Sequence, residues 1–372
     1  MTVKLADNII SPLGLDTASN YQAVKQGMSQ LKRHEGVFGL PEPFVASLFN
    51  RDEINVEGNY TFFEKIAILS ASRALAEADI DPASPRVCFV VSTTKANVDL
   101  LQDAQGFDSR RVMPGAAARQ ISEYFGNNNE PIVVSNACTS GVCAQLVAKR
   151  LLDTGCYDYA VVTGADVQSH FIISGFNSFK ALSPEPCKPF DKNRCGLNLG
   201  EAAATIVYAR RDSIADDEWQ AVAGAIRSDA NHISGPSRTG EGSYRCLMPL
   251  LQHCDAGDLA FINTHGTATP YNDEMESFAI ERAGLSEVPA NSLKGYYGHT
   301  MGAAGVLETI ISMNAIDDNT ILPTRGFEEM GVTHKVNIVA QRGTTQKHAF
   351  IKMLSGFGGS NAAMLFRKGG QQ

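Results

Sequence analysis

Two features of the sequence predict an α/β protein with largely parallel, buried sheets. Short apolar runs typical of strands alternate with longer amphipathic runs typical of helices. The strand-like runs are residues 87–91, 132–135, 159–163, 203–208, 259–263 and 350–354. The helix-like runs are residues 62–78, 142–152, 273–283 and 305–315. With 372 residues, the chain is long enough for two or three domains or for one large unit.

A charged stretch near the middle of the chain marks a predicted boundary. Residues 210–218 follow one apolar run and precede another, so we expect two units, residues 1–210 and 211–372. No short-period repeat, low-complexity segment or proline-rich linker interrupts them. Any duplication of one half in the other is too faint to prove from the letters alone.

The composition is that of a globular protein without a nucleic-acid-binding character. Hydrophobic residues make up 44% and charged residues 19%, and the formal net charge is -8. A strongly basic domain is absent, so no nucleic-acid partner is expected. The eight scattered cysteines include no C-x-x-C pair, which indicates reduced thiols rather than disulfides.

The N-terminal segment and the apolar runs predict a cytoplasmic location. No apolar stretch follows the first basic residues, so a signal peptide is not expected. No run approaches the roughly 18 apolar residues that a membrane-spanning helix needs, so no membrane span is expected either.

Cys138 lies where a β-rich run, P-I-V-V-S-N-A, gives way to a helix beginning near Thr139. The free N–H groups and the dipole of a helix N-terminus favour a thiolate, the form of cysteine that attacks acyl groups. A buried structural cysteine is the alternative, because free cysteines are among the most buried residues. We expect Cys143, one turn further on, to pack in this way.

Two histidines and a lysine follow later apolar runs. His265 ends L-A-F-I-N-T-H-G-T, and Lys294 and His299 lie in the glycine-rich stretch K-G-Y-Y-G-H-T-M-G. Loops at the carboxyl ends of strands gather catalytic groups in such folds, and imidazoles there can donate to a developing oxyanion. Each histidine alone could equally cap or pack. A zinc site with Cys138 is disfavoured because no two ligands are close in sequence.

A glycine-rich turn near the C-terminus carries another candidate. In K-M-L-S-G-F-G-G-S-N-A-A, glycines at 356, 358 and 359 separate two strand-like runs. Such a turn allows close backbone approach and could direct the N–H of Phe357 toward a site. A plain β-hairpin would give the same letters.

Together these segments resemble the β-ketoacyl-acyl-carrier-protein synthase family, specifically its elongating branch with a Cys-His-His site. The matching stretches, in the family's order, are N-A-C-T-S-G, P-F-D-K-N-R-C-G-L-N-L-G-E-A-A-A, H-G-T-A-T-P-Y-N-D, K-G-Y-Y-G-H-T-M-G-A-A-G and G-F-G-G-S-N. S-P-L-G near the N-terminus and G-P-S-R-T-G-E-G at 235–242 also fit. One such motif would be weak, whereas five in order are highly specific.

The resemblance implies a thiolase-like fold, with two similar α/β halves in a five-layer α-β-α-β-α stack, normally dimeric. It implies a decarboxylative Claisen condensation between a cysteine-bound acyl group and malonyl-acyl-carrier protein. No cofactor is implied, because phosphopantetheine arrives on the acyl-carrier protein. The implied partners are that carrier protein and a second synthase, either the same chain or a related one.

The resemblance also assigns residues. Cys138 would be the acylated nucleophile, and His265 and His299 would stabilise the enolate formed by decarboxylation. Lys294 would support the electrostatics of the site. Glu308 would pair with Lys294, since an unpaired buried lysine is costly.

Binding roles follow in the same way. The N–H groups of Cys138 and Phe357 would form the oxyanion hole, and Phe357 would gate the acyl pocket. Thr267 and Thr269 would hydrogen-bond the pantetheine arm. Carrier proteins are acidic, so basic residues near P-F-D are docking candidates, with solvated surface charge as the alternative; they are Lys188, Lys192 and Arg194.

The chain departs from the family mainly between residues 92 and 131, where it is shorter. In the family this region contributes to the dimer interface and the floor of the acyl pocket. Lys95 is unexpected there for an alkyl substrate, unless it faces solvent with only its stem packed. The acyl group and the pathway, primary fatty-acid or specialised polyketide or aryl-polyene synthesis, therefore stay open.

Three related functions are the alternatives to an elongating synthase. A chain-length-factor-type subunit of a heterodimer would have a mainly structural role, but such subunits lack the nucleophilic cysteine. A degradative thiolase would have a second catalytic cysteine near the C-terminal glycine turn. A starter synthase would have asparagine in place of His299. The sequence therefore favours an elongating enzyme.

Overall fold

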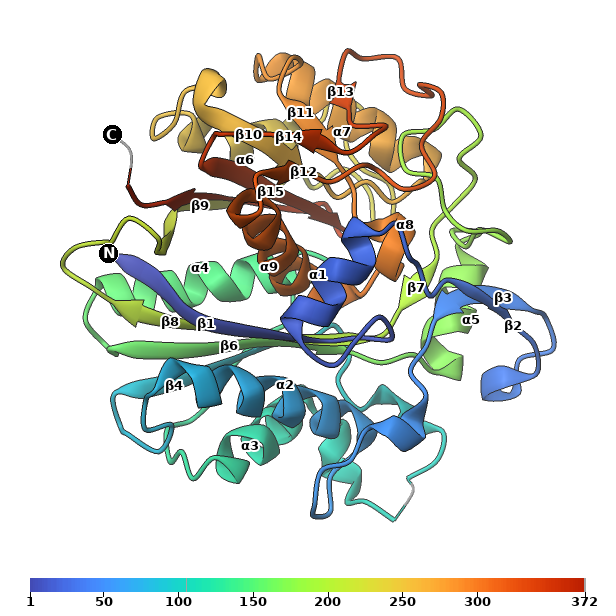
Figure 1. Ribbon diagram of the computed structural model, residues 1–372. Coiled ribbons are helices and arrows are strands. Elements are labelled where there is room, and N and C mark those ends of the chain that lie inside the picture. The colour runs from blue at the N-terminus through green and yellow to red at the C-terminus, as the bar shows by residue number, and fades with distance from the viewer. Residues whose placement is uncertain (105, 371–372) are drawn as a thin grey trace.

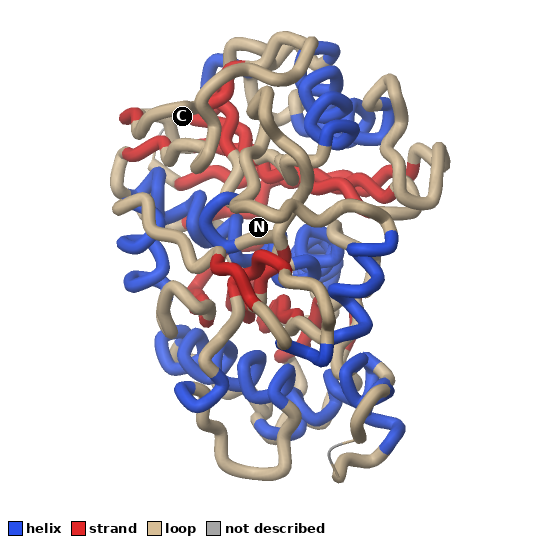
Figure 2. The backbone as a smooth tube through the Cα atoms, turned by 90° about the vertical axis from the view of Figure 1, so that its right-hand side faces the viewer, coloured by secondary structure: helices blue, strands red, loops and turns tan. Residues whose placement is uncertain are grey.

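Five layers, alternately helical and sheet, make up the computed structural model, which describes residues 1–104 and 106–370 (Figure 1). One outer layer contains α2 (Phe62–Ala78) and α3 (Pro114–Tyr124), and the other contains α6 (Glu241–Leu250) and α7 (Pro270–Arg282). The central layer contains α4 (Ser140–Asp153) and α9 (Ala304–Asp317). Figure 2 shows the same layers from the side, with the strands between helices. No helix in the described part of the chain is long and apolar enough to cross a membrane.

The strands form two similar halves. The first half contains β1 (Thr2–Ile10), β4 (Val87–Ser92), β5 (Ile132–Val134), β6 (Tyr159–Asp166) and β8 (Ala202–Arg210). The second contains β9 (Trp219–Ser228), β10 (Leu259–Asn263), β11 (Pro289–Asn291), β13 (Asn337–Ile338), β15 (Ala349–Gly356) and β16 (Ser360–Lys368). The predicted boundary at 210/211 lies where β8 ends.

Shorter elements complete the described chain. The remaining helices are α1 (Thr17–Lys25), α5 (His170–Ser178) and α8 (Lys294–Tyr297). The 3-10 turns are η1 (Val37–Gly39), η2 (Arg51–Glu53), η3 (Val98–Leu101), η4 (Ser109–Val112), η5 (Ala256–Asp258) and η6 (Met301–Ala303). One small sheet contains β2 (Lys32–His34), β3 (Phe44–Ser47) and β7 (Leu199–Gly200). Another contains β12 (Thr320–Ile321) and β14 (Gly343–Thr344).

Strand order repeats between the halves. The first half runs β5-β4-β6-β8-β1 and the second β11-β10-β15-β16-β9, with β13 added at the edge. Five strands numbered in chain order therefore give 3-2-4-5-1 in both halves. A single bridge, Val3 to Gln220, joins the two sheets. The duplication that the letters could not prove is thus present in the topology.

The expectation of largely parallel sheets is only partly right. β5, β4 and β6 are parallel, as are β11, β10 and β15, but β8, β1, β16 and β9 form antiparallel pairs. Because both sheets are covered by helices on both faces, parallel and antiparallel strands alike are apolar runs without alternation. Sequence periodicity cannot distinguish their directions in this situation.

The two central helices pack through glycine. A Cβ built on Gly141 of α4 would lie 2.8 Å from the Cα of Gly305 in α9. Small residues at this point allow the helix backbones to approach closely. The N-termini of α4 and α9 therefore meet in the middle of the molecule, where each half contributes loops to one place.

Candidate active site

The turn that carries Cys138 is held in place by the opposite half. The strand before it, β5, ends at Val134, earlier than the predicted Ala137, and α4 begins at Ser140. Between them Ala137 adopts a left-handed conformation with φ 48°. The Asn136 amide donates to the Ser360 hydroxyl at 2.8 Å, and the hydroxyls of Thr139 and Ser360 are also 2.8 Å apart. Cys138, 8% exposed, is thus fixed beside β16.

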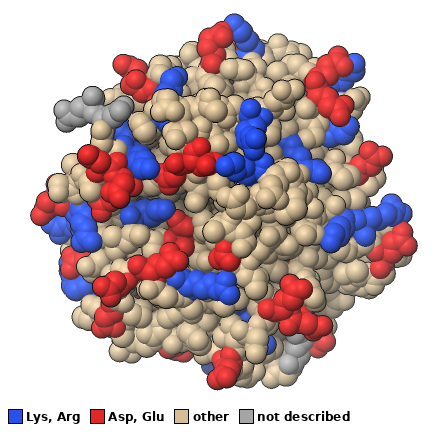
Figure 3. Space-filling model, in the orientation of Figure 1, with Lys and Arg blue, Asp and Glu red and all other residues tan. Residues whose placement is uncertain are grey.

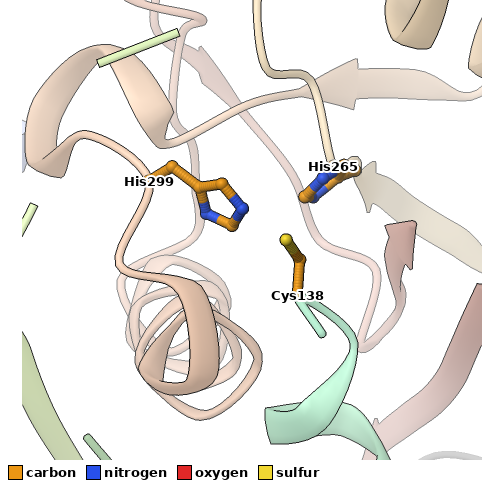
Figure 4. A group of neighbouring side chains, drawn as sticks. All are labelled: Cys138, His265 and His299. Carbon is orange, nitrogen blue, oxygen red and sulfur yellow. The ribbon is translucent and has the colours of Figure 1, made fainter. Parts of the chain in front are cut away.

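Three of the predicted residues meet at this point. The sulfur of Cys138 and ring nitrogens of His265 and His299 lie within 4.8 Å of one another. Figure 4 shows the three side chains converging from separate segments. The imidazole centroids are 5.1 Å apart and the rings are nearly perpendicular, at 79°. A thiol and two imidazoles can therefore contact the same small reactant.

Both histidines are held through their main chain. The N–H groups of His265 and Gly266 donate to the buried Glu276 carboxylate at 2.6 and 2.8 Å. The His299 N–H donates to the Asn198 carbonyl at 2.7 Å. These bonds fix the loops that follow β10 and α8, so the positions of the rings do not depend on exposed side chains.

The His299 ring has a defined tautomer. Its Nδ1 accepts the N–H of Met301 at 3.3 Å, so a neutral ring carries its hydrogen on Nε2. That Nε2 is buried and has no partner among the described residues. Burial, followed by the charges of Lys294 and Lys352, holds the pKa of His299 well below its ordinary value. His299 is therefore a neutral hydrogen-bond donor.

The environment of His265 has the same effect. Burial lowers the pKa of His265 well below its usual range, and Lys294, His299 and Lys352 add to this. A second neutral imidazole thus stands beside the thiol.

The resting sulfur is not the preformed thiolate expected from its place near a helix N-terminus. Burial raises the pKa of Cys138 to about 11, although the charges of Lys95 and Lys294 act in the opposite direction. Cys138 lies outside α4, separated from its first residue by Thr139, and desolvation is the largest influence on the thiol. The cysteine is therefore a thiol at neutral pH until a reactant changes its surroundings.

A buried ionic cluster lies behind the histidines. Glu308 accepts hydrogen bonds from Lys294, as predicted, and also from Lys352. All three side chains are at most 2% exposed. The Lys352 ammonium also donates to the Thr264 carbonyl at 3.1 Å, one residue before His265. Sequence reasoning missed Lys352, although a lone lysine in the apolar run A-F-I-K-M-L was a signal.

A cavity of about 450 Å³ opens onto the three side chains. Cys138, His265 and His299 line it, together with Thr267 and Thr269, whose hydroxyls are 2.9 Å apart. The cavity is large enough for an extended substrate arm that ends at the sulfur.

Phe357 also lines the cavity, at the turn between β15 and β16. Its ring packs against Phe176 and Phe179, with centroids 5.7 and 5.4 Å away. A Cβ on the preceding Gly356 would lie 3.0 Å from the Cys138 backbone nitrogen, so a larger residue would push the two segments apart. The turn that carries the Phe357 amide therefore lies against the Cys138 amide, and it is also the hairpin that the sequence allowed.

Comparison with known proteins gives the family. A family model for the N-terminal domain of beta-ketoacyl synthases matches residues 21–213, and one for the C-terminal domain matches residues 220–328. The chain belongs to the β-ketoacyl synthase family. It is a condensing enzyme of the acyltransferase class, as the sequence motifs predicted.

Individual relatives agree with this placement. The chain is 34% identical over 410 aligned residues to 3-oxoacyl-[acyl-carrier-protein] synthase 2 of Rhizobium meliloti (strain 1021), covering 97% of both chains. A ketosynthase in complex with its chain length factor from Xenorhabdus doucetiae superposes with a TM-score of 0.88 at 22% identity, covering 99% of this chain and 98% of that one. A ketosynthase solved with its type II polyketide synthase acyl-carrier protein gives 0.83 at 19%, covering 98% of each. The predicted thiolase-like fold is confirmed.

The predicted docking residues of this synthase differ in availability. Lys192 is exposed and pairs with Glu329 at 2.7 Å, and Lys188 is half-buried. Arg194 uses its guanidinium on main-chain carbonyls, including that of Asp191 at 3.0 Å, so it stabilises the loop. Figure 3 shows basic and acidic side chains interspersed on one face of the synthase. Lys188 and Lys192 are therefore better docking candidates than Arg194.

The thiol and the two imidazoles have the residue types of a zinc site, and their spacing is compatible with one. A metal would need a lone pair on the ring nitrogen that faces it. The bond from the Met301 N–H to Nδ1 instead places a hydrogen on Nε2 of His299. The arrangement fits donation to a substrate oxygen better than metal binding.

Proposed function

We propose that this synthase joins an acyl group on Cys138 to a malonyl unit, releasing carbon dioxide and a 3-oxoacyl product. The observation that carries the proposal is a buried thiol that shares one cavity with two neutral imidazoles. Both substrates would arrive as thioesters of phosphopantetheine on an acyl-carrier protein, so the enzyme needs no cofactor of its own.

In the first step, the Cys138 sulfur attacks the acyl thioester. A bond forms between the sulfur and the acyl carbon, the carbon–sulfur bond to pantetheine breaks, and the thiol proton ends on the pantetheine sulfur. The oxygen that becomes negative in between would accept the N–H groups of Cys138 and Phe357. One such donor is typically worth about 10²–10³ in rate.

In the second step, malonyl-carrier protein loses carbon dioxide. The electrons of the broken carbon–carbon bond form an enolate, whose oxygen would accept the Nε2–H of His299 and a hydrogen bond from His265. The enolate carbon attacks the acyl carbonyl, a carbon–carbon bond forms and the bond to sulfur breaks. The released thiolate then takes a proton from solvent water and restores the resting thiol.

The surrounding residues would prepare these steps. Burial first, and then the charges of the two lysines that share Glu308, lower the pKa of both imidazoles, so each is a neutral ring that can donate one N–H. Thr267 and Thr269, which line the cavity, would hydrogen-bond the amides of the pantetheine arm. Phe357, in contact with Phe176 and Phe179, would gate the entry of the acyl chain.

We also propose an acyl-carrier protein as partner, docked near Lys188 and Lys192, and a dimer with the same or a related chain. Solved ketosynthases of this fold occur with an acyl-carrier protein and with a chain length factor. A heterodimer in which this chain is the catalytic half, or has a mainly structural role, is the alternative. Native mass spectrometry of the chain co-expressed with its genomic neighbours separates homodimer from heterodimer.

Acyl loading tests the proposal directly. The wild-type protein, incubated with acyl-carrier-protein thioesters, should gain the mass of one acyl group on Cys138. Cys138→Ala should gain none, whereas Cys143→Ala, which changes the buried cysteine one turn away, should load normally if it folds. Full acyl transfer to the Cys138→Ala protein would falsify the assignment.

A further inference from the structure

Lys95 lies at the same sheet edge as the nucleophile. Ser92, at the end of β4, is in register with Val134 of β5 and with Gly164 of β6. The loop after β4 stays beside the one that carries Cys138, because the Thr93 N–H donates to the Val134 carbonyl at 3.3 Å. The Ser135 hydroxyl donates to the Thr94 carbonyl at 3.4 Å. Lys95 therefore follows a strand adjacent to the one that leads to Cys138.

The loop that carries Lys95 is rigid. The Ala96 N–H donates to the Thr93 hydroxyl at 2.8 Å, and Ala96 adopts a left-handed φ of 44°. Next along the chain, the buried Asn97 amide donates to Glu64 at 3.0 Å and to the Arg111 carbonyl at 2.9 Å. These contacts fix the base of the Lys95 side chain, so only its methylene stem can move.

The Lys95 residue is half-buried, and its ammonium forms no ion pair with any described residue. Its one hydrogen bond goes to the neutral Thr94 hydroxyl at 3.3 Å. In the part of the chain that the structure describes, no carboxylate lies within 4.0 Å of its nitrogen. This contrasts with Lys294 and Lys352, which share Glu308.

A nearby buried carboxylate makes no ion pair with Lys95, although burial raises the pKa of Asp166 and the charge of Lys95 opposes that effect. Asp166, at the end of β6, accepts the hydroxyls of Thr93 and Thr94 at 2.7 and 2.9 Å and the N–H of Gly302 at 2.7 Å. It also accepts the Thr94 N–H at 3.0 Å. Its oxygens are thus occupied by neutral donors, and Lys95 keeps unused hydrogen-bonding capacity.

The charge of Lys95 acts on the reacting groups. It opposes the effect of burial on the pKa of Cys138, and it helps to lower the pKa of His299. Thiol activation is not its main result, since burial still raises the pKa of Cys138 to about 11. The cavity that would admit pantetheine does not include Lys95 among its lining residues. The lysine therefore acts on the sulfur from the loop beside the one that carries Cys138, without lining the cavity itself.

We infer that Lys95 recognises a carboxylate carried by the acyl group on Cys138. This inference rests on the proposed function and narrows its substrate class. An alkyl chain packed against Lys95 would remove water from an unpaired cation, which is costly. A carboxylate at the far end of the acyl group would instead form a charge-assisted hydrogen bond. The preferred donor is then a dicarboxylic acid linked to the carrier through one carboxyl only.

A competition between matched acyl donors tests the inference. The wild-type protein is offered succinyl-, glutaryl- and adipyl-carrier protein together with the alkyl thioesters of equal length, butanoyl, pentanoyl and hexanoyl. Intact mass reports which group reaches Cys138. We expect the best carboxyl-bearing donor to load at least about ten-fold faster than its alkyl match, the size of one charge-assisted hydrogen bond.

Variants at position 95 give the matched controls. Lys95→Met keeps the stem and removes the charge, so it should lose the preference or favour the alkyl donors, whereas Lys95→Arg should retain much of it. Lys335→Met, at an exposed lysine paired with Glu287, should leave the preference unchanged. Equal loading of both donor types by the wild type, unaltered in Lys95→Met, contradicts the inference. So does a Lys95→Met protein with a changed oligomeric state and unchanged selectivity, because Lys95 would then pair with a partner subunit.

A binding measurement separates this inference from the proposed function. Glutaryl-pantetheine is titrated into the Cys138→Ala protein with and without Lys95→Met, and weaker binding in the double variant supports carboxylate recognition without any chemistry. Equal binding by the two proteins contradicts it. If the wild type loads no donor at all, the proposed condensation fails, and the titration still decides the role of Lys95.

Discussion

The two halves of the synthase share one topology but divide the chemistry. Each has the strand order 3-2-4-5-1, and each directs one central helix, α4 or α9, toward the site. The first half contributes the thiol of Cys138, whereas the second contributes His265 and His299. The cluster of one thiol and two imidazoles is therefore complete only where the two copies of the motif meet.

The halves also differ in buried charge near the site. In the first half, the Asp166 carboxylate is held by hydroxyl and main-chain donors. In the second half, Glu308 is held by Lys294 and Lys352, both fully buried. Duplication thus supplies the frame, and the ammonium groups are concentrated in the half whose imidazoles must stay neutral.

Removing the Glu308 carboxylate, which Lys294 and Lys352 share, should have the largest effect on stability. Glu308→Gln would leave Lys294 and Lys352 buried without a counter-ion, so the free energy of unfolding should fall by about 3–5 kcal/mol. Urea unfolding measures this difference. Glu130→Gln, which breaks the exposed pair with Arg119, is the matched control and should cost less than about 1 kcal/mol. Equal urea midpoints for Glu308→Gln and the wild type would contradict the role of the cluster.

Removing one imidazole should separate the two half-reactions. His299→Ala is expected to slow malonyl decarboxylation by about 10²–10³, the typical value of one preorganised donor to an oxyanion. Acyl loading of Cys138 should continue, since it depends on the thiol and main-chain donors. Carbon dioxide release and intact mass report the two steps, with the exposed His253→Ala as control. Loss of both acyl loading and decarboxylation in a folded variant would mean that His299 serves both half-reactions.

The sequence predicted which side chains come together more completely than it predicted the direction of the strands. The motifs around Cys138, His265 and His299 identify the residues because chemistry restricts which amino acids can stand there. Strand direction was wrong for β8, since a strand buried on both faces is apolar in either direction, whereas the antiparallel pairing of β15 with β16 agrees with the hairpin that the glycine-rich turn allowed. Lys352 was missed for a related reason: its partner Glu308 is distant in sequence, and a single charge in an apolar run does not reveal what neutralises it.

The protonation state of Cys138 could not be predicted from position either. A cysteine near a helix N-terminus suggested a thiolate, but the letters do not report how completely the sulfur is buried. Packing by the loops of both halves determines that burial, which raises the pKa of Cys138 more than the nearby lysines lower it. Long-range packing was thus the missing information in each of these cases.

Disturbing the contact between α4 and α9 should reduce stability less than removing the Glu308 carboxylate. A methyl group on Gly141 would lie 2.8 Å from the Gly305 backbone, so Gly141→Ala should lower the free energy of unfolding by about 1–3 kcal/mol. Thermal or urea unfolding measures it. In Gly175→Ala, the control, the added Cβ meets nothing within 4 Å in α5, so stability should be unchanged or slightly higher. Equal stability of the two variants would mean that α4 and α9 can move apart at this point without loss of stability.

The pH dependence of Cys138 reactivity tests whether the first half alone activates the sulfur. With a pKa raised to about 11, the thiolate fraction of Cys138 should grow about ten-fold per pH unit from neutrality to about pH 10. Iodoacetamide alkylation, followed by intact mass in a background with the exposed Cys156 and Cys195 changed to serine, reports that fraction. A rate that levels off near neutral pH would mean that the helix of the first half activates the sulfur unaided. A rate that keeps rising means that activation waits for the substrate, whose carbonyl engages the donors beside the sulfur and whose leaving thiolate accepts the proton.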